Sequence, residues 1–205
     1  SIELSSGGTL QIGSNGGNLQ TDLTNNGTLV FENSVDSTYS GSVDGTGRVR
    51  FAMPSAAVLS LTGSNAWSGG TAIDGGTLLV SNSSALGTAG TISFGGGTLQ
   101  FSSDNTVDYS SRFDGSGNQA FSLDTNGLDV TLASGIAGPG STLEKLGVGT
   151  LILTGNNTFT GLSTVSAGTL QIGGGAGTGS VAGNIQNDAT LAFDRSGSLI
   201  YGGVI

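Results

Sequence analysis

Few side chains in this sequence could do chemistry, because two of the most versatile residue types are absent. The chain contains no His and no Cys. A hydrolytic triad needs a base that orients and deprotonates its nucleophile, and that base is usually a His. Zinc sites rely on His and Cys ligands. Any chemistry would therefore have to come from carboxylates and a small number of basic residues.

Carboxylate pairs are the first remaining candidates, because two Asp or Glu residues are able to hydrolyse a glycosidic bond. The pairs closest in sequence are Asp104 with Asp108 and Asp124 with Asp129. Asp residues in turns and on exposed strands produce the same pattern, and we expect that simpler role here. The sequence therefore assigns no catalytic residue.

A calcium loop is the second candidate, and it begins at Asp114. Asp114, Ser116 and Asn118 occupy the first, third and fifth positions of such a loop. The sixth position should be Gly and is Gln119, and the twelfth should be Glu and is Thr125. We therefore expect no bound metal and no cofactor.

A basic pair in "GRVRF" is the third candidate. Arg48 and Arg50 lie on one face of a predicted strand, with Asp44 nearby, and solenoid polysaccharide lyases use a Lys or Arg base beside Asp residues. A charged patch on a solvated strand explains the same residues, and we favour that explanation.

Composition limits the partners. The chain of 205 residues has a net charge of −9 from five basic and 14 acidic residues. A nucleic-acid surface needs a basic stripe, which five residues are too few to build. The same shortage disfavours an anionic membrane surface, and there is no run of ~18 apolar residues to span a bilayer. We expect no nucleic acid as partner and no direct membrane insertion.

The elements that would position these residues are short strands. A five-residue unit, typically Gly-Thr-Leu-x-apolar, recurs every 19 to 21 residues within three groups. The units begin at Gly8, Gly27 and Gly47, then at Ala57, Gly76 and Gly97, then at Gly149, Gly168 and Ala189. A fixed period of this length indicates a repeat architecture.

Within each unit, apolar and polar residues alternate. Leu170 and Ile172 are predicted to point to one face, and Thr169 and Gln171 to the other. This period of two is typical of a strand with one buried face. Coils of about 20 residues fit a β-solenoid, in which each coil buries its apolar face against its neighbours. A β-sandwich also has many short strands, but its sequence does not repeat.

The solenoid predicts how the residues stack. Inward ladders are expected from Leu10, Leu29, Leu78, Leu99, Leu151, Leu170 and Leu191. In the turn "TGNNT", Gly155 and either Asn156 or Asn157 are expected to adopt positive φ. Trp67 and Phe159 should cover the core at matched corners. The less regular stretch 103–148 is interpreted as further coils, so residues 1–205 are predicted to form a single domain.

The stretch "LEKLGVGTLILTGNNTFTGLSTVSAGTLQIG", from Leu143 to Gly173, closely resembles the passenger-associated transport repeat, also called the autotransporter-associated β-strand repeat. An earlier copy, from Val58 to Ser81, lacks the Lys and the Gly-x-Gly of the pattern but keeps an aromatic at Trp67. "FDRSGSLIYGGVI" resembles the segment that leads into a further repeat, and "FENSVDSTYSGSV" is a weaker version of it. The chain ends within that unit, so we expect it to be a fragment of a longer repeat array.

The resemblance implies a right-handed parallel β-helix in a secreted bacterial surface protein, without catalytic residues. The positions that match the family pattern are Lys145, Gly147, Gly149, Thr150, Leu151, Leu153, Thr154, Gly155, Asn157, Phe159, Gly161, Val165, Gly168, Thr169 and Leu170, and in the earlier copy Leu61, Gly63, Asn65, Trp67, Gly69, Gly76, Thr77 and Leu78.

The sequence predicts a non-enzymatic stalk, outside the cell or on the outer membrane, that assists export and display of the passenger. Its main partner would be the rest of the same passenger chain. The alternative is an adhesive module that binds an extracellular glycan or protein through outward residues such as Gln11, Gln100 and Gln171. A carbohydrate-cleaving solenoid is the enzymatic alternative.

Overall fold

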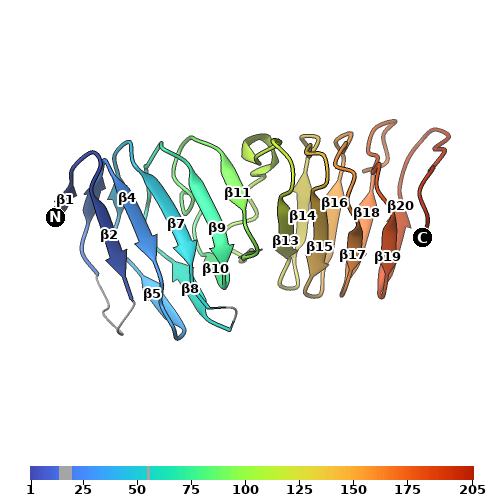
Figure 1. The fold of residues 1–205 in the computed structure, drawn as a ribbon. Coiled ribbons are helices and arrows are strands. Elements are labelled where there is room, and N and C mark those ends of the chain that lie inside the picture. Colours follow the sequence, from blue (N-terminus) through green and yellow to red (C-terminus); the bar gives the residue numbers. More distant parts are fainter. Residues whose placement is uncertain (14–19, 55) are drawn as a thin grey trace. The chain divides into compact units, whose positions relative to one another are not determined.

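Short parallel strands joined by turns make up nearly all of the computed structural model, which describes residues 1–13, 20–54 and 56–205 (Figure 1). In that part of the chain the one helical element is a 3-10 turn, η1 (Ser110–Arg112). None of the described residues forms a helix long and apolar enough to cross a membrane. The all-β class predicted from the sequence is confirmed.

The chain forms two compact units, Ser1–Asn105 and Thr106–Ile205. The single domain expected over 1–205 stays a prediction. The strands of unit 1 are β1 (Ile2–Leu4), β2 (Thr9–Ile12), β3 (Leu23–Asn25), β4 (Thr28–Phe31), β5 (Ser37–Tyr39), β6 (Val43–Asp44), β7 (Arg48–Ala52), β8 (Val58–Leu61), β9 (Thr71–Gly75), β10 (Thr77–Val80), β11 (Ile92–Phe94) and β12 (Thr98–Gln100). They stack in the orders β1-β3-β6, β2-β4-β7-β9-β11 and β5-β8-β10-β12.

Unit 2 has a simpler plan, because successive strands alternate between two sheets. Its strands are β13 (Ala120–Asp124), β14 (Asp129–Leu132), β15 (Thr142–Leu146), β16 (Thr150–Leu153), β17 (Ser163–Val165), β18 (Thr169–Ile172), β19 (Ile185–Asn187) and β20 (Thr190–Phe193). The sheets are β13-β15-β17-β19 and β14-β16-β18-β20. Two strands therefore make one coil, and the predicted coils in 103–148 are confirmed from β13 onward.

The coils stack in register. Thr150 of β16 pairs with Thr169 of β18, which pairs in turn with Thr190 of β20. These partners are 19 and 21 residues apart, which confirms the predicted solenoid with coils of about 20 residues. Parallel stacking pairs the backbone groups of each coil with those of the coils before and after it.

The predicted leucines lie in three separate ladders. In register, the first ladder contains Leu10, Leu29 and Val49, the second Leu59, Leu78 and Leu99, and the third Val130, Leu151, Leu170 and Leu191. Leu29, Leu78, Leu99, Leu151 and Leu170 are all fully buried. Leu10 and Leu191 are half-buried, because each belongs to the first or last strand of its sheet.

Candidate functional site

The two copies of the repeated stretch, 92 residues apart, fold into the same local structure. In each copy, buried and exposed residues alternate along a strand and then through the turn that follows it. The strands β8 and β16 end at Leu61 and Leu153, but the alternation continues to Trp67 and Phe159. The buried residues are Leu59, Leu61, Gly63, Asn65 and Trp67 in the first copy and Leu151, Leu153, Gly155, Asn157 and Phe159 in the second.

Asn157 links three successive coils from inside the second copy. Its side chain is 2% exposed. The Oδ1 atom accepts a hydrogen bond from the Ile136 N–H at 2.8 Å, and Nδ2 donates to the Gly155 and Ser180 carbonyl oxygens at 3.0 and 2.8 Å. Ile136 belongs to the coil before and Ser180 to the coil after. A buried amide that is fully hydrogen-bonded in this way fixes the relative position of its neighbours.

Asn65 does the same in the first copy. It is 3% exposed and accepts a hydrogen bond from the Val43 N–H at 2.9 Å. Its Nδ2 donates to the carbonyl oxygens of Gly63 at 3.2 Å and of Ala85 at 2.9 Å. The same three bonds in both copies mean that the repeat uses this position as an inter-coil link.

The turn in the repeat differs from its prediction. Neither Gly155 nor Asn156 nor Asn157 has a positive φ, so that expectation is wrong. Gly155 is required by close packing instead, because a Cβ there would lie 2.5 Å from the Gly135 backbone nitrogen in the coil before. At Gly63 a Cβ would likewise clash with a carbonyl oxygen of the preceding coil.

The two aromatic residues close the corner from inside. Trp67 is 1% exposed and Phe159 is fully buried, as predicted from their matched positions. Burial of an indole N–H requires a partner, and Trp67 Nε1 donates to Thr71 Oγ1 at 3.1 Å. Phe159 has no polar group to satisfy, so the same corner accepts either ring.

Lys145 is fully buried and caps two turns. Its ammonium donates to the carbonyl oxygens of Leu146 at 2.8 Å, Gly147 at 2.7 Å and Ala167 at 3.2 Å. These three acceptors match the three N–H donors of an ammonium group. Burial lowers the pKa of Lys145, and the Asp124 carboxylate opposes this shift with a smaller effect. Lys145 thereby ties the turn after β15 to the turn before β18.

Four glycines of the pattern do need a left-handed backbone. Gly76 and Gly168 precede β10 and β18 with φ of 64° and 67°. Gly147 and Gly149 have φ of 68° and 93° in the turn that Lys145 caps. Gly adopts such angles without the steric cost that a Cβ brings, so these positions set the direction in which each strand begins.

The other pattern residues divide by face. Val165, Leu170 and Leu78 are buried, whereas Thr77, Thr150, Thr154, Thr169, Gly161 and Gly69 are half-buried or exposed. In each copy, the buried members therefore lie on the inner face of the solenoid, where they are stacked with residues of neighbouring coils.

Two of the candidate catalytic carboxylates, Asp108 and Asp124, accept hydrogen bonds from backbone N–H groups. Asp108 accepts hydrogen bonds from the N–H and Oγ of Ser110 and from the Ala133 N–H. Asp124 accepts one from the Asn126 N–H at 2.8 Å. Asp104 and Asp129 are exposed. The bonds of Asp108 and Asp124 are those of turn-forming Asp residues.

The residues of the candidate calcium loop form turns of the solenoid. Asp114 accepts a hydrogen bond from the Ser116 N–H at 2.9 Å, as in an Asx turn. Thr125, at the closing position, is buried, and its Oγ1 donates to the Val148 carbonyl oxygen at 2.8 Å. Asn118 has a φ of 54°. Across the described ranges, no three His, Cys, Asp or Glu residues group together in a way that could hold a metal ion.

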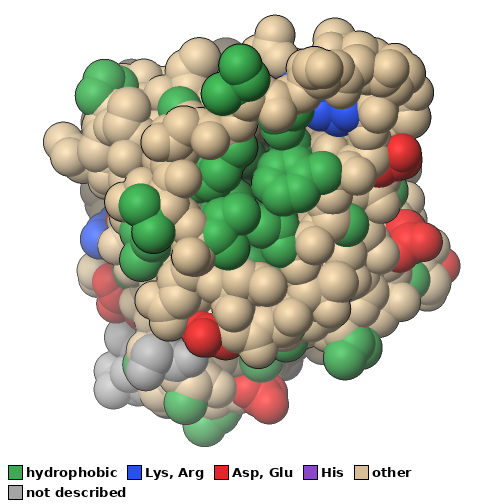
Figure 2. All heavy atoms as spheres, turned by 90° about the vertical axis from the view of Figure 1, so that its right-hand side faces the viewer, with side chains coloured by type: hydrophobic (Ala, Val, Ile, Leu, Met, Phe, Trp, Pro, Cys, Tyr) green, Lys and Arg blue, Asp and Glu red, His purple; other side chains and the backbone are tan. Residues whose placement is uncertain are grey.

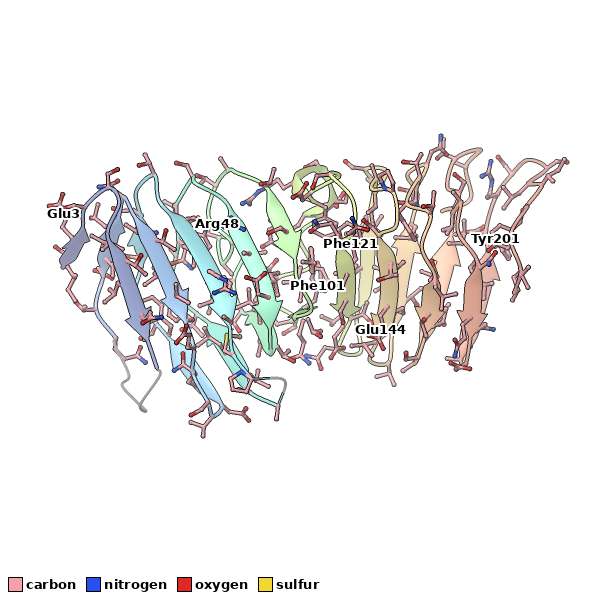
Figure 3. The ribbon with its side chains drawn as sticks, viewed as in Figure 1. Glu3, Arg48, Phe101, Phe121, Glu144 and Tyr201 are labelled. Carbon is pink, nitrogen blue, oxygen red and sulfur yellow. The ribbon has the colours of Figure 1, made fainter. Side chains whose placement is uncertain are left out.

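The two candidate basic residues lie on the exposed face of β7, where Arg48 is labelled in Figure 3. Arg50 pairs with Asp74, Nε to Oδ2 at 2.5 Å, with side chains 45% and 27% exposed. Arg48 Nη2 donates to Ser93 Oγ at 3.2 Å. Asp44 is exposed at the end of β6. On this solvated face Arg50 links β7 to its neighbour β9, and Arg48 reaches past β9 to β11.

Two of the three outward glutamines, Gln11 and Gln171, bridge coils. Gln11 Nε2 donates to Glu32 Oε1 at 3.2 Å. Gln171 Nε2 donates to the Gly173 carbonyl oxygen at 3.0 Å and to Asp194 Oδ2 at 3.3 Å. Gln100, at the end of β12, is half-buried.

Sequence reasoning missed several buried polar residues. Asn25 is fully buried; its Nδ2 donates to the Arg48 carbonyl oxygen at 3.0 Å, and its Oδ1 accepts from the Gly27 N–H at 3.1 Å. Ser141 is also fully buried, and its Oγ accepts a hydrogen bond from the Gln119 N–H. Asn25 lies two residues after the buried Leu23, so the alternation of the strand could have identified it.

Comparison with known proteins agrees with this geometry. The family model for the passenger-associated-transport-repeat matches residues 56–80 and 143–172, which contain both inter-coil asparagines. The chain is 42% identical over 161 residues to the adhesin BmaC autotransporter of Brucella suis biovar 1 (strain 1330). That alignment covers 78% of this chain and 5% of the relative. No solved structure matches the chain. The chain is therefore an autotransporter passenger segment with passenger-associated-transport repeats, located at the bacterial surface or secreted from it.

Proposed function

We propose that this segment is a non-enzymatic structural module, a stalk whose coil-by-coil folding assists export and display of its passenger. The observation that carries the proposal is that the polar side chains of the repeat are buried and bond to backbone groups of the solenoid. Asn65, Asn157 and Lys145 are all buried, and every hydrogen bond described for their side chains joins backbone groups of the same or adjacent coils. The polar residues that are characteristic of the repeat therefore hold neighbouring coils together.

Stacking of this kind suits export. A chain that leaves through a narrow pore crosses it unfolded, and no ATP is available outside the cell. Each coil that emerges gains an interface with the coil already folded. Folding outside the pore then makes backward movement of the chain unfavourable. Two strongly linked stacking units would serve this step.

The test is surface display of the full-length parent protein. One variant replaces Leu151, Leu153, Leu170 and Ile172 by Ser, which removes buried apolar contacts in β16 and β18. We expect less passenger at the cell surface, measured by antibody binding to intact cells. Total synthesis of the chain is measured in parallel, so that poor expression is distinguished from poor export.

The matched control replaces outward residues of the same two strands, Thr150, Thr169 and Gln171, by Ser. We expect normal display, because these side chains contribute little to the core. Normal display of the core variant would refute the export role.

An adhesive module is the second candidate, and the relative's name supports it. That relative is called an adhesin, and it aligns with most of this chain. In this case an exposed sheet face would bind an extracellular glycan or protein. The core variant would then be displayed normally but fail to attach to its target, which is the opposite of the export result.

A carbohydrate-cleaving solenoid has less support. Sugar-binding grooves are lined by aromatic side chains, but Trp67, Tyr39 and Tyr109 are at most 3% exposed. The basic pair of β7, Asp108 and Asp124 are held in the structural bonds described above, and Asp104 and Asp129 are exposed. We therefore propose no enzymatic activity.

A further inference from the structure

The two exposed basic side chains of the described structure lie on the same strand. The chain has five basic residues, and all of them are within the described ranges. Lys145 is buried and Arg112 and Arg195 are half-buried, which leaves Arg48 and Arg50. In the view of Figure 2, acidic side chains are spread over the surface and basic ones are few. The outer face of β7 is therefore a local positive site in a chain with a net charge of −9.

This pair lies at the centre of its sheet. β7 is the third of the five strands in β2-β4-β7-β9-β11, and its burial pattern places both arginines on the outer face. Residues two apart on a strand are separated by about 7 Å. The strands on both sides of β7 fix the place of Arg48 and Arg50, so the pair belongs to the interior of the stack and not to either end of it.

Both guanidinium groups are held across the sheet, yet most of their N–H groups are unused. Arg50 Nε pairs with Asp74 Oδ2 at 2.5 Å, and Arg48 Nη2 donates to Ser93 Oγ at 3.2 Å. Among the described residues, these are the hydrogen bonds that the two side chains make, although each guanidinium has five N–H donors. Arg48 therefore has no carboxylate partner there. A carboxylate binds well to two parallel N–H groups of one guanidinium, and both arginines keep donors for it.

The surface beneath the two guanidinium groups is apolar. Val30 and Ala72 pair in register with Arg50 on the two flanking strands. They are only 5% and 0% exposed, although they share its outward face. Burial of Ala72 is expected where the Arg48 side chain crosses β9 to reach Ser93, because arginine stems cover apolar surface and leave the guanidinium in water. Both groups are thus positioned before a ligand binds, which reduces the entropic cost of binding.

A row of hydroxyl groups continues from Arg48. Thr9 on β2 and Thr28 on β4 pair in register with it. Thr9 is exposed and Thr28 is half-buried. Threonine hydroxyls both donate and accept hydrogen bonds, as the hydroxyl groups of a sugar do. This row matches a ligand that carries neutral hydroxyl groups beside its negative charge.

We propose that the β7 face, formed by Thr9, Thr28, Arg48 and Arg50, binds an extended extracellular polysaccharide in which uronate sugars alternate with neutral sugars. The proposal names a partner for the adhesive module, the second candidate function above, and it rests on that function. A densely sulfated polysaccharide fits less well, because two arginines beside Asp74 neutralise few charges and the rest of the chain is acidic. A sheet face suits an extended chain, whereas a terminal sugar needs a concave pocket.

Titration of the chain with a hyaluronan hexasaccharide tests the proposal, because glucuronate and N-acetylglucosamine alternate in that probe. Binding is followed by shifts of backbone amide signals in NMR spectra, up to millimolar concentrations of the probe. We expect Arg48→Gln to weaken binding at least about tenfold, since a charge-assisted pair is lost. Arg48→Lys should restore only part of the affinity, because Lys keeps the charge but lacks the planar fork. Reduction of the probe's carboxylates to hydroxymethyl groups should weaken its binding as much as Arg48→Gln does.

The matched control is Asn156→Asp, which lowers the net charge by one, as Arg48→Gln does, at an exposed position of unit 2. We expect it to bind the hexasaccharide as tightly as the unaltered chain. Urea midpoints of all variants are measured in parallel and should match that of the unaltered chain.

The proposal is overturned if the hexasaccharide does not bind, if Arg48→Gln and Asn156→Asp bind it equally, or if heparin fragments of the same length bind more tightly. In any of these cases, continued attachment of cells that display the full-length parent would leave the adhesive function standing with a different partner. The export role is tested by surface display, which does not depend on this binding.

Discussion

Asn157 provides the sharpest test of how the repeat holds its coils together. In Asn157→Leu, the side chain keeps a similar volume but loses its acceptor and both of its donors. The buried Ile136 N–H is then left unpaired, since Asn157 Oδ1 is its partner. The Gly155 carbonyl oxygen still accepts a hydrogen bond from the Ser180 N–H, and the Ser180 carbonyl oxygen still accepts one from the Asn157 N–H. The loss of the Asn157 side chain therefore costs less free energy at these two carbonyls than at the Ile136 N–H.

The expected cost follows from these three bonds. An unpaired buried N–H costs about 1 to 3 kcal/mol, and each lost hydrogen bond to a still-satisfied carbonyl about 0.5 to 1.5 kcal/mol. We expect the free energy of unfolding to fall by about 3 kcal/mol. With a denaturant slope of about 2 kcal/mol per molar urea, the midpoint should fall by about 1.5 M.

The assay is urea unfolding of the chain followed by circular dichroism, and its control is the adjacent residue. Asn156 is exposed, so Asn156→Leu should change the unfolding free energy by no more than about 0.5 kcal/mol. The same contrast should hold for Asn65→Leu against Ser64→Leu in the first copy. Equal midpoints for the Asn157 and Asn156 variants would refute the inter-coil link.

Four other predictions follow from the same structure. Lys145→Met should lower the unfolding free energy by about 2 to 4 kcal/mol, because three carbonyls lose a donor. Arg50→Met, at an exposed ion pair, should lower it by no more than about 1 kcal/mol. The midpoints of urea unfolding measure both effects. Leu170→Asp should abolish native-like melting, because a buried unpaired carboxylate costs several kcal/mol, while Gln171→Asp should cost about 1 kcal/mol or less on its solvated face; a reversed order would contradict the assigned faces. Burial raises the pKa of Tyr39 to about 12 from 10.0; the folded state therefore holds its proton more tightly, and the stability from this residue is present below about pH 10 and lost between about 10 and 12. Tyr39→Phe should remove that part of the alkaline loss, and identical pH profiles would argue against it. Calcium chelation should leave the melting temperature unchanged because no oxygen-rich loop is closed by a Glu; a reversible drop on chelation would reveal a metal site.

The sequence predicted the strands well, because period-two alternation and a fixed spacing report burial and coil length directly. Leu170, Ile172, Trp67 and Phe159 are buried as expected from those patterns. The distribution of the leucines over three ladders was harder to predict, since all units share nearly the same five letters. Which ladder each unit joins depends on corners that the spacing does not encode.

The turn of the repeat shows a second limit. Gly and Asn in a turn normally indicate positive φ, so "TGNNT" was assigned that conformation. The structure uses Gly155 for close approach of two coils and Asn157 for hydrogen bonds to both neighbours. Both reasons involve residues about 20 positions away, which local sequence does not reveal. The burial of Lys145 is of the same kind, because Ala167, one of its acceptors, lies in the next coil.

We propose that the repeat supports export by stabilising the stacked coils. The most direct measurement compares surface display of the full-length parent with the urea midpoint of this chain, for Asn65→Leu, Asn157→Leu, Lys145→Met and the exposed controls Ser64→Leu and Asn156→Leu. We expect the displayed amount to fall with the midpoint, so that the three buried variants are displayed least and both controls are displayed normally. Normal display of all three buried variants, despite lowered midpoints, would contradict it.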